Sequence, residues 1–256
     1  MQPAPDKLDV KSAALFLDVD GTLLPIRDNP AEVVARNGLV QLLEQCAARL
    51  DGALALVSGR SIAEVDRIFA PVEFPAAGAH GAELRYGDGR IVMVAETRLP
   101  QHALASLQSF AGSHDGLLLE DKGSGVSLHY RRAPALESAC RQCMEQLLDE
   151  LGDTFRLIAG KMVFEIAPAA HNKGAAINRL LESGSFVGRR PVFIGDDVTD
   201  EDGFRAVNAR GGVSIRVGEG SSSAAHHELA AVEDVSPWLR NAILVPPVTA
   251  YNGESR

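Results

Sequence analysis

Two carboxylates that follow a wholly apolar segment constrain the fold of this 256-residue chain more than any other feature. The apolar segment at 13–17, Ala-Ala-Leu-Phe-Leu, reads as a buried strand, and Gly21 and Pro25 mark the loop after it. Asp18 and Asp20 stand two residues apart, so they converge if the extended geometry persists into the loop. Burying two unpaired carboxylates is costly, and a bound cation relieves that cost. The alternative is a strand that ends in a solvated acidic turn.

Strands and helices alternate in the first and last parts of the chain. The expected elements are strands at 15–17, 53–57, 76–79, 191–194 and 213–217, a hairpin of strands 82–86 and 90–94, and helices at 31–49, 61–70, 173–182, 201–209 and 224–230. This alternation predicts βαβ units and a parallel sheet. Open α/β sheets bind ligands at the carboxyl ends of their strands, and the polar clusters of the chain fall at those ends.

The pattern changes between these two parts. Helices are expected at 101–111 and 134–151, and strands at 116–120, 125–130, 154–158 and 162–166. This order of elements fits an inserted α+β unit better than a continued parallel sheet. We therefore predict an α/β fold, with a doubly wound core in two sequence pieces and a smaller insert between them.

Two polar positions that follow or precede predicted elements suit an anion. Ser58, Gly59 and Arg60 end the second predicted strand, and an Arg side chain offers a planar fork for phosphate oxygens. A serine at this place is also an ordinary helix cap. Lys173 opens a predicted helix, where a positive charge opposes the macrodipole unless a negative partner lies nearby. A surface lysine is the equal alternative.

The strongest later signal is a run of five carboxylates in the seven residues 196–202, directly after an apolar strand. Clustered carboxylates repel each other, and their pKa values rise without a cation. Mg²⁺ prefers hard oxygen ligands and binds one or two carboxylates together with substrate phosphate. Asp200 and Glu201 also stand where a negative charge favours the start of the helix at 201–209. Together with the earlier residues, this run predicts a phosphoryl-transfer site.

Composition excludes several other classes of function. The formal net charge is −9, and no basic patch points to nucleic acid, so a phosphorylated substrate needs local positive charge. The three cysteines argue against a disulfide framework, and helix packing explains Cys140 and Cys143 better than a redox or zinc site. No apolar run is long enough for a membrane helix, and the N-terminus lacks a signal peptide. We expect a cytoplasmic monomer that acts on a small molecule.

The motifs resemble those of the haloacid dehalogenase superfamily of phosphatases. Its four motifs correspond here to Asp18-x-Asp20-x-Thr22, Ser58, Lys173, and Gly195-Asp196-Asp197 followed by Asp200. Within the superfamily, the chain resembles the trehalose-6-phosphate phosphatase family. The supporting stretches are 18–25, 58–60, 79–83, 120–122, 129–131, 160–161 with Glu165, and 196–202.

The resemblance implies a haloacid dehalogenase-like, Rossmannoid core at 1–97 and 169–256, with an α+β cap domain at 98–168. It implies a Mg²⁺-dependent phosphatase that hydrolyses trehalose 6-phosphate to trehalose and phosphate through an aspartyl-phosphate. The same core chemistry would serve another sugar phosphate, such as sucrose 6-phosphate or a mannosyl phosphate. A phosphomutase and a sensor without turnover are further alternatives, and a sensor would be expected to lack Asp18, Asp20 or Lys173.

The resemblance also implies a role for each site residue. Asp18 would be the nucleophile and Asp20 the general acid and base, while Ser58, Lys173 and Arg60 bind phosphoryl oxygens. Mg²⁺ would be held by Asp18, the backbone carbonyl of Asp20 and Asp196, with Asp197 and Asp200 orienting these ligands. The residues expected to contact the sugar are Glu120, Lys122, Arg131, Lys161 and Glu165. Taken singly, these could instead be surface residues, for example with Glu120 and Lys122 as a solvated pair. His80 and Glu83 would position the sugar or stabilise the core loop.

Overall fold

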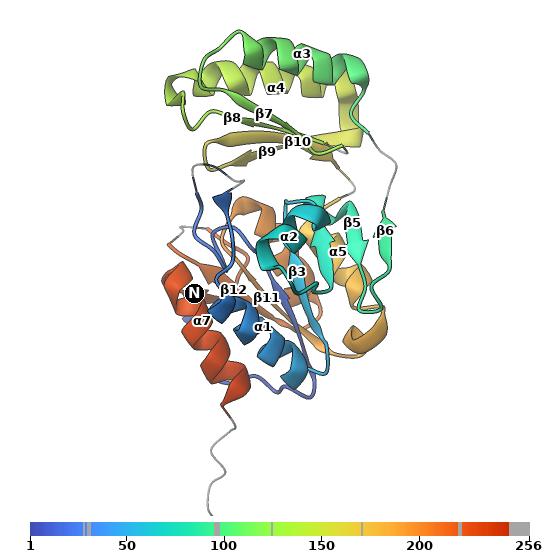
Figure 1. Cartoon of the computed structure of the whole chain (residues 1–256), viewed down its shortest axis with the longest axis vertical. Coiled ribbons are helices and arrows are strands. Elements are labelled where there is room, and N and C mark those ends of the chain that lie inside the picture. Colours follow the sequence, from blue (N-terminus) through green and yellow to red (C-terminus); the bar gives the residue numbers. More distant parts are fainter. Residues whose placement is uncertain are drawn as a thin grey trace, which may run out of the picture.

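The protein is built on two separate β-sheets, which lie one above the other in the view of Figure 1. The computed structural model describes residues 1–27, 29, 32–94, 98–123, 125–169, 171–219 and 222–245. The lower part of Figure 1 is built on a nine-stranded sheet, which we call the main sheet. The upper part, whose helices and strands lie within residues 101–168, holds a four-stranded sheet, and we call it the insert. Buried apolar side chains form a separate cluster in each part, so each has its own core.

The main sheet brings two distant stretches of the chain together. In spatial order its strands are β1 (Gln2–Pro3), β13 (His227–Leu229), β12 (Val213–Val217), β11 (Arg190–Gly195), β2 (Ala13–Leu17), β3 (Leu54–Val57), β4 (Ala76–Gly78), β5 (Glu83–Arg85) and β6 (Ile91–Met93). Neighbouring strands are parallel except for the β4–β5 and β5–β6 pairs. The sheet is therefore mostly parallel, and β5 and β6 form the predicted hairpin.

Helices cover both faces of the main sheet. They are α1 (Asn37–Arg49), α2 (Ile62–Phe69), α5 (Lys173–Leu180), α6 (Glu201–Ala209) and α7 (Val232–Leu239). α1 and α7 pack together on one face, and α5 and α6 pack together on the other (Figure 1). This doubly wound arrangement confirms the predicted fold class.

The main sheet changes its direction of growth between β2 and β11. The chain first adds β3 and β4 on one side of β2, and later adds β12 and β13 beyond β11. β2 pairs with β11 in parallel, from Ala13 opposite Arg190 to Leu17 opposite Ile194. All of β2 is buried because a central parallel strand is covered on both faces, which explains its unbroken apolar sequence. Sheets of this kind bind ligands beyond the carboxyl ends of the strands at such a switch point.

The insert is an antiparallel sheet with two helices on one face. Its strands are, in spatial order, β7 (Leu118–Asp121), β8 (Val126–His129), β10 (Val163–Pro168) and β9 (Phe155–Gly160), and its helices are α3 (Gln101–Gly112) and α4 (Glu137–Leu151). Figure 1 shows the helices on the outer face, so the other face of this sheet is turned toward the core. Cys140 is buried in the apolar cluster of the insert, and Cys143 packs against that cluster, as expected for helix packing.

Two expectations about elements of the core are wrong, and one helix was not expected. Residues 224–230 do not form a helix: they contain β13, which pairs with β12 and β1, so tertiary pairing overrides local helix propensity. The first helix begins at Asn37 rather than at 31. Val33 and Ala35 are buried between exposed neighbours, and the backbone N–H of Ala35 donates to the carbonyl of Ile68, so this segment packs on α2 in extended form. The sequence did not predict α7.

No helix of the described part of the chain is long and apolar enough to cross a membrane. The predicted cytoplasmic location and monomeric state stay predictions. The same is true of the domain boundaries at 97/98 and 168/169, the first of which touches residues outside the described ranges.

Candidate active site

Asp18 and Asp196 meet at the switch point of the main sheet. The backbone N–H of Asp18, which follows β2, donates to the carbonyl of Ile194 in β11 at 3.0 Å, and Asp196 follows β11 directly. Gly21 has a φ of +87°, and a Cβ at this position would overlap the Asp196 carboxylate. The glycine after Asp20 is therefore required by the close approach of the two loops.

Lys173 connects two of the buried carboxylates. It opens α5, where the side chain of Asn172 accepts a hydrogen bond from the backbone N–H of Ala175 and caps the helix. Its Nζ lies 2.6 Å from Oδ1 of Asp18 and 2.6 Å from Oδ1 of Asp200. Burial lowers the pKa of Lys173, but the two carboxylates outweigh burial and hold this pKa above its ordinary value. A cation that opposes the helix dipole thus has two negative partners, and a surface position is excluded.

The ionised form of Asp18 depends on nearby cations. Burial raises the pKa of Asp18 well above its ordinary value, Lys173 opposes this effect, and Asp200 and Asp196 add to it. The Oδ2 atom of Asp18 is buried and accepts no hydrogen bond from the described residues. A buried carboxylate oxygen without a partner is costly, and a cation is one means of relieving that cost.

Asp200 and Asp197 shape the acidic loop after β11. Asp200 is fully buried, and its Oδ2 accepts hydrogen bonds from the backbone N–H groups of Asp196 and Asp197, both at 2.9 Å. Asp197 caps the short turn Val198–Asp200, because its Oδ1 accepts from the backbone N–H of Val198 at 2.6 Å. Both side chains therefore hold the loop that presents Asp196.

The acidic cluster fits a Mg²⁺ ion. Carboxylate oxygens of Asp18, Asp196 and Asp200 lie within 4.8 Å of one another. Both oxygens of Asp200 already accept hydrogen bonds, whereas Oδ2 of Asp18 and Oδ1 of Asp196 are buried and have no hydrogen-bond partner among the described residues. Burial raises the pKa of Asp196 as well, against the hydrogen bond from Lys161. Two such hard oxygens suit Mg²⁺, and the contribution expected from the backbone carbonyl of Asp20 stays a prediction.

Asp20 is held by Arg60. The Arg60 Nε donates to Oδ2 of Asp20 at 2.6 Å, and its Nη2 donates to Oδ1 at 2.8 Å. Burial lowers the pKa of Arg60, but the hydrogen bonds and charge of Asp20 raise it above its ordinary value. The hydroxyl oxygen of Ser58 accepts from the backbone N–H of Arg60 at 3.1 Å, which fixes the loop at 58–60. The position of Asp20 thus depends on this loop as well as on the end of β2.

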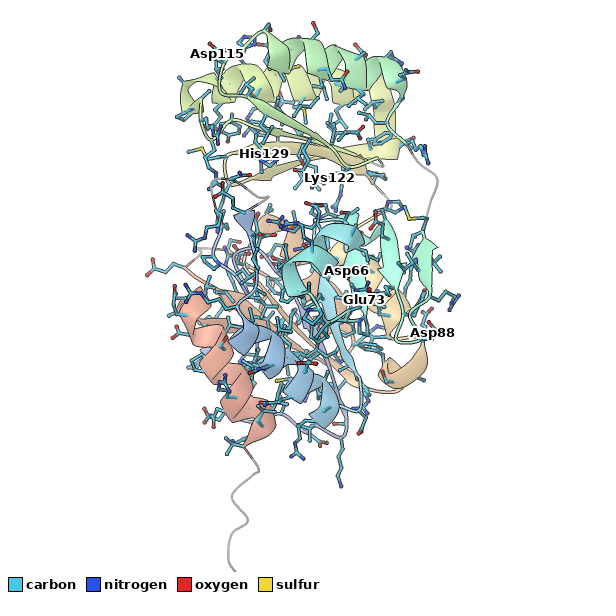
Figure 2. The ribbon with its side chains drawn as sticks, viewed as in Figure 1. Asp66, Glu73, Asp88, Asp115, Lys122 and His129 are labelled. Atoms are coloured by element: carbon cyan, nitrogen blue, oxygen red, sulfur yellow. The ribbon has the colours of Figure 1, made fainter. Side chains whose placement is uncertain are left out.

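Two lysines of the insert reach the core. Lys161, in the turn between β9 and β10, places its Nζ 2.9 Å from Oδ2 of Asp196. Lys122, directly after β7, donates to Oε2 of Glu165 at 2.8 Å and to the carbonyl of Gly59 at 3.2 Å. Figure 2 shows Lys122 on the side of the insert that faces the main sheet. Because Lys122 pairs with Glu165, the alternative of a solvated pair with Glu120 is excluded.

The other predicted site residues of the insert, Glu120, Arg131 and Glu165, also have polar partners. Oε2 of Glu120 lies 2.9 Å from Nε2 of His129, and this hydrogen bond lowers the pKa of Glu120. Arg131 donates to the carbonyl of Lys161 at 3.2 Å. Burial raises the pKa of Glu165, but His80 and Lys122 outweigh burial and hold this pKa well below its ordinary range. An ionised carboxylate therefore sits at the contact between insert and core.

A cavity of about 540 Å³ lies between the two parts of the protein. The predicted residues that line it are Asp18, Asp20, Ser58, Arg60, Lys173, Asp196 and Asp197 of the core and Glu120, Lys122, Arg131, Lys161 and Glu165 of the insert. This volume suits a small-molecule ligand. Asp200, the remaining predicted residue, does not line the cavity and acts on it through Lys173.

The structure decides between the two roles expected for Glu83 and adds one residue, Ser127, that was not predicted. Glu83 accepts a hydrogen bond from the backbone N–H of Ile62 at 2.7 Å, so it supports the start of α2. Ser127 was not predicted, and it donates to Oε2 of Glu165 at 3.0 Å. It stands two residues before His129 on β8, and this period of two places both side chains on one face.

Comparisons with known proteins agree with this geometry. The sequence pattern of the trehalose-phosphatase family matches residues 16–236. The probable trehalose-phosphate phosphatase of Sinorhizobium fredii is 46% identical over 210 residues, which cover 82% of this chain and 79% of that protein. The trehalose-6-phosphate phosphatase of Escherichia coli is 41% identical over 227 residues, which cover 88% of this chain and 85% of that protein.

Solved structures share the fold. A trehalose-6-phosphate phosphatase related protein superimposes with a TM-score of 0.73 and 29% identity, over 90% of this chain and 96% of that one. A haloacid dehalogenase-like hydrolase from B. subtilis superimposes with a TM-score of 0.61 over 88% of this chain and 98% of that one. At 16% identity this second likeness supports the fold alone.

Proposed function

Because the chain belongs to the trehalose-phosphatase family of haloacid dehalogenase-like phosphatases, we propose that it hydrolyses trehalose 6-phosphate to trehalose and phosphate. One observation carries the chemistry: buried Lys173 bridges Asp18 and Asp200, beside the Oδ2 atom of Asp18, which has no hydrogen-bond partner among the described residues. This arrangement would provide a carboxylate nucleophile and a fixed positive charge at the core side of the cavity. Both are what transfer of a phosphoryl dianion needs.

In the first step, a carboxylate oxygen of Asp18 attacks phosphorus. A bond forms between Asp18 and phosphorus as the bond between phosphorus and the sugar oxygen breaks. Asp20 gives its proton to the leaving sugar oxygen, and acid–base help of this kind contributes about 10²–10⁴-fold. The products of this step are trehalose and an aspartyl-phosphate on Asp18.

In the second step, water attacks the phosphorus of the aspartyl-phosphate. Asp20, now a carboxylate, takes a proton from that water, and Arg60 holds Asp20 in place for this role. The bond between Asp18 and phosphorus breaks, which releases phosphate and restores the Asp18 carboxylate. Ser58 and Lys173 bind phosphoryl oxygens throughout, with Arg60 as a further donor.

Bound Mg²⁺, held by Asp18, Asp196 and the backbone carbonyl of Asp20, would neutralise charge on the phosphoryl group as the carboxylate approaches it. The loop that presents Asp196 is held by Asp197 and Asp200. Because burial raises the pKa of both Asp18 and Asp196, added positive charge also favours their ionised forms.

The insert at 98–168 acts as a cap domain that selects the substrate, over a catalytic core at 1–97 and 169–256. Glu120, Lys122, Arg131, Lys161 and Glu165 line the upper side of the cavity, where a disaccharide offers many hydroxyl groups. Paired acids and bases supply donors and acceptors for those hydroxyls, and the cavity volume suits one small molecule. Both features support a sugar phosphate as substrate.

Phosphate release across a panel of sugar phosphates tests this proposal. The panel holds trehalose 6-phosphate, sucrose 6-phosphate, glucose 6-phosphate and mannose 6-phosphate, each assayed with Mg²⁺ and with EDTA. We expect the highest kcat/KM for the trehalose ester, and a loss of about 100-fold or more when EDTA removes the metal. Preference for another ester would contradict the proposed substrate but not the aspartate mechanism. Full activity in EDTA would contradict the proposed requirement for Mg²⁺.

A further inference from the structure

His80 is a buried core residue that touches the insert and takes no part in the chemistry proposed above. It lies in the turn Ala79–Gly81 after β4, where Ala79 has a φ of 46° and His80 a φ of 55°. Residues other than glycine seldom adopt this conformation, and it persists only where the surrounding structure enforces it. The backbone N–H of Ala79 donates to the carbonyl of Arg60, and that of His80 to the carbonyl of Ser58, so the turn is tied to the phosphate-binding loop.

The imidazole of His80 holds one oxygen of Glu165 from the core side. Its Nε2 lies 3.0 Å from Oε1 of Glu165, and both side chains are at most one tenth exposed. The other oxygen, Oε2, accepts hydrogen bonds from Lys122 and Ser127, which both belong to the insert. Core and insert therefore each hold one oxygen of the same carboxylate.

The hydrogen-bond partners indicate which nitrogen of His80 donates. A carboxylate accepts hydrogen bonds, so Nε2 carries the hydrogen that faces Glu165. Nδ1 is buried and has no hydrogen-bond partner in the described part of the chain. The contact with Glu165 therefore depends on Nε2 alone.

The ring has little freedom to turn away from Glu165. A Cβ added at Gly59 would lie 2.6 Å from Nε2 of His80, so the imidazole packs directly over the backbone of that glycine. The carbonyl of Gly59 accepts the hydrogen bond from Lys122. Gly59 thus contacts both His80 and Lys122, the two residues that hold opposite oxygens of Glu165.

We propose that His80 is a positioning residue for sugar recognition, which fixes the carboxylate of Glu165 from the core so that it meets the sugar hydroxyls in one orientation. The inference rests on the proposed function, in which Glu165 contacts the sugar. Without His80, Oε1 of Glu165 loses its core partner and the carboxylate is free to rotate. Binding of the sugar then weakens, while transfer of the phosphoryl group from a small ester does not change.

Three substitutions of His80 test this role. His80→Gln places an amide donor at the position of Nε2, His80→Asn places it at the position of Nδ1, and His80→Ala removes it. We expect the Ala and Asn variants to lose about 10- to 100-fold in kcat/KM for trehalose 6-phosphate, mostly through KM, and the Gln variant to stay within about threefold. Hydrolysis of p-nitrophenyl phosphate should stay within about threefold in all three. His102→Gln, on the exposed surface of α3, is the matched control.

A purely structural role for His80 predicts a different order. Asn adopts a positive φ more readily than Gln or Ala, so strain in the turn would make Asn the best tolerated variant. That order, or equal losses for both substrates, would overturn the proposal. If the Ala variant fails to fold, the Gln and Asn variants decide the outcome.

A second background separates this proposal from the proposed function. In a Glu165→Gln protein, His80→Asn should cost less than about twofold more for the sugar phosphate, because the two residues act as one unit. Additive losses would overturn the proposal. If the native protein prefers another sugar phosphate of the panel, the substrate assignment fails by itself and the same comparisons are made with the preferred ester.

Discussion

The Asp18→Asn variant is expected to lose about 10⁴-fold or more in kcat for trehalose 6-phosphate and to keep a melting temperature equal to or above that of the native protein. The amide has the shape of the carboxylate but is a poor nucleophile, so no aspartyl-phosphate forms. Steady-state phosphate release and calorimetry measure the two quantities. Asp115→Asn, an exposed site at the outer end of the insert in Figure 2, should change neither.

The stability of this variant follows from the direction of the pKa shift. Burial raises the pKa of Asp18 above its unfolded value, so this residue favours folding most at low pH and loses that contribution as the pH rises through its folded pKa. At neutral pH the uncharged asparagine avoids the free-energy cost of burying an ionised carboxylate, and Lys173 keeps Asp200 as its partner. Substantial turnover by the asparagine variant would remove Asp18 as the nucleophile.

Lys173→Met is expected to have the largest effect on stability. The substitution leaves the buried carboxylates of Asp18 and Asp200 without their shared cation, and loss of one partner from a buried ion pair costs about 3–5 kcal/mol. We expect the free energy of unfolding to fall by this amount at pH 7, and kcat to fall by about 10²–10³-fold because a phosphoryl ligand is lost. Urea unfolding at pH 7 and pH 5, in EDTA, measures the stability.

The loss of stability should be smaller at pH 5 than at pH 7. Burial raises the folded pKa of Asp18, and loss of Lys173 removes the charge that opposes this shift, so Asp18 takes up a proton as the pH falls and no longer needs a cation. Lys11→Met, on the exposed N-terminal segment, is the matched control and should change stability by less than about 0.5 kcal/mol. A Lys173→Met protein as stable as the native one at pH 7 would show that Lys173 does not hold the cluster together.

The parts of the fold that were predicted correctly are those with strong local patterns. β2 and β11 are unbroken apolar runs because they lie at the centre of a covered parallel sheet, and the turn residues around Gly87 mark the β5–β6 hairpin. β13 was misread because three residues carry little pattern of their own, and its pairing with β12 decides its structure. The extended segment before α1 was misread because its burial against α2 is a tertiary property.

The sequence predicted which residues form the site, but not which of them contact each other. Asp18, Lys173 and Asp196 stand out in sequence because each follows a strand or opens a helix. The alternation of side chains along a strand does not predict that Arg60 donates hydrogen bonds to Asp20, or that Lys161 of the insert donates to Asp196. The two residues of each pair are at least 35 positions apart in the sequence. The order of residue types along a chain does not specify which distant charged residues form ion pairs. Such pairs between insert and core place the insert against the core.

The central position of β2 has a consequence for the order in which the protein is made. Its neighbour β3 leaves the ribosome soon after it, but its other neighbour, β11, emerges only after the whole insert has been synthesised. The elements of the insert all lie within residues 101–168, so this unit has its partners at hand while one edge of β2 is still open. A chain ending at residue 169 should therefore protect the insert from hydrogen exchange, while the backbone N–H groups of β2 that face β11, and that of Asp18, exchange freely. Assembly of the catalytic centre is a late event of synthesis, and the growing chain carries an exposed apolar strand edge until then.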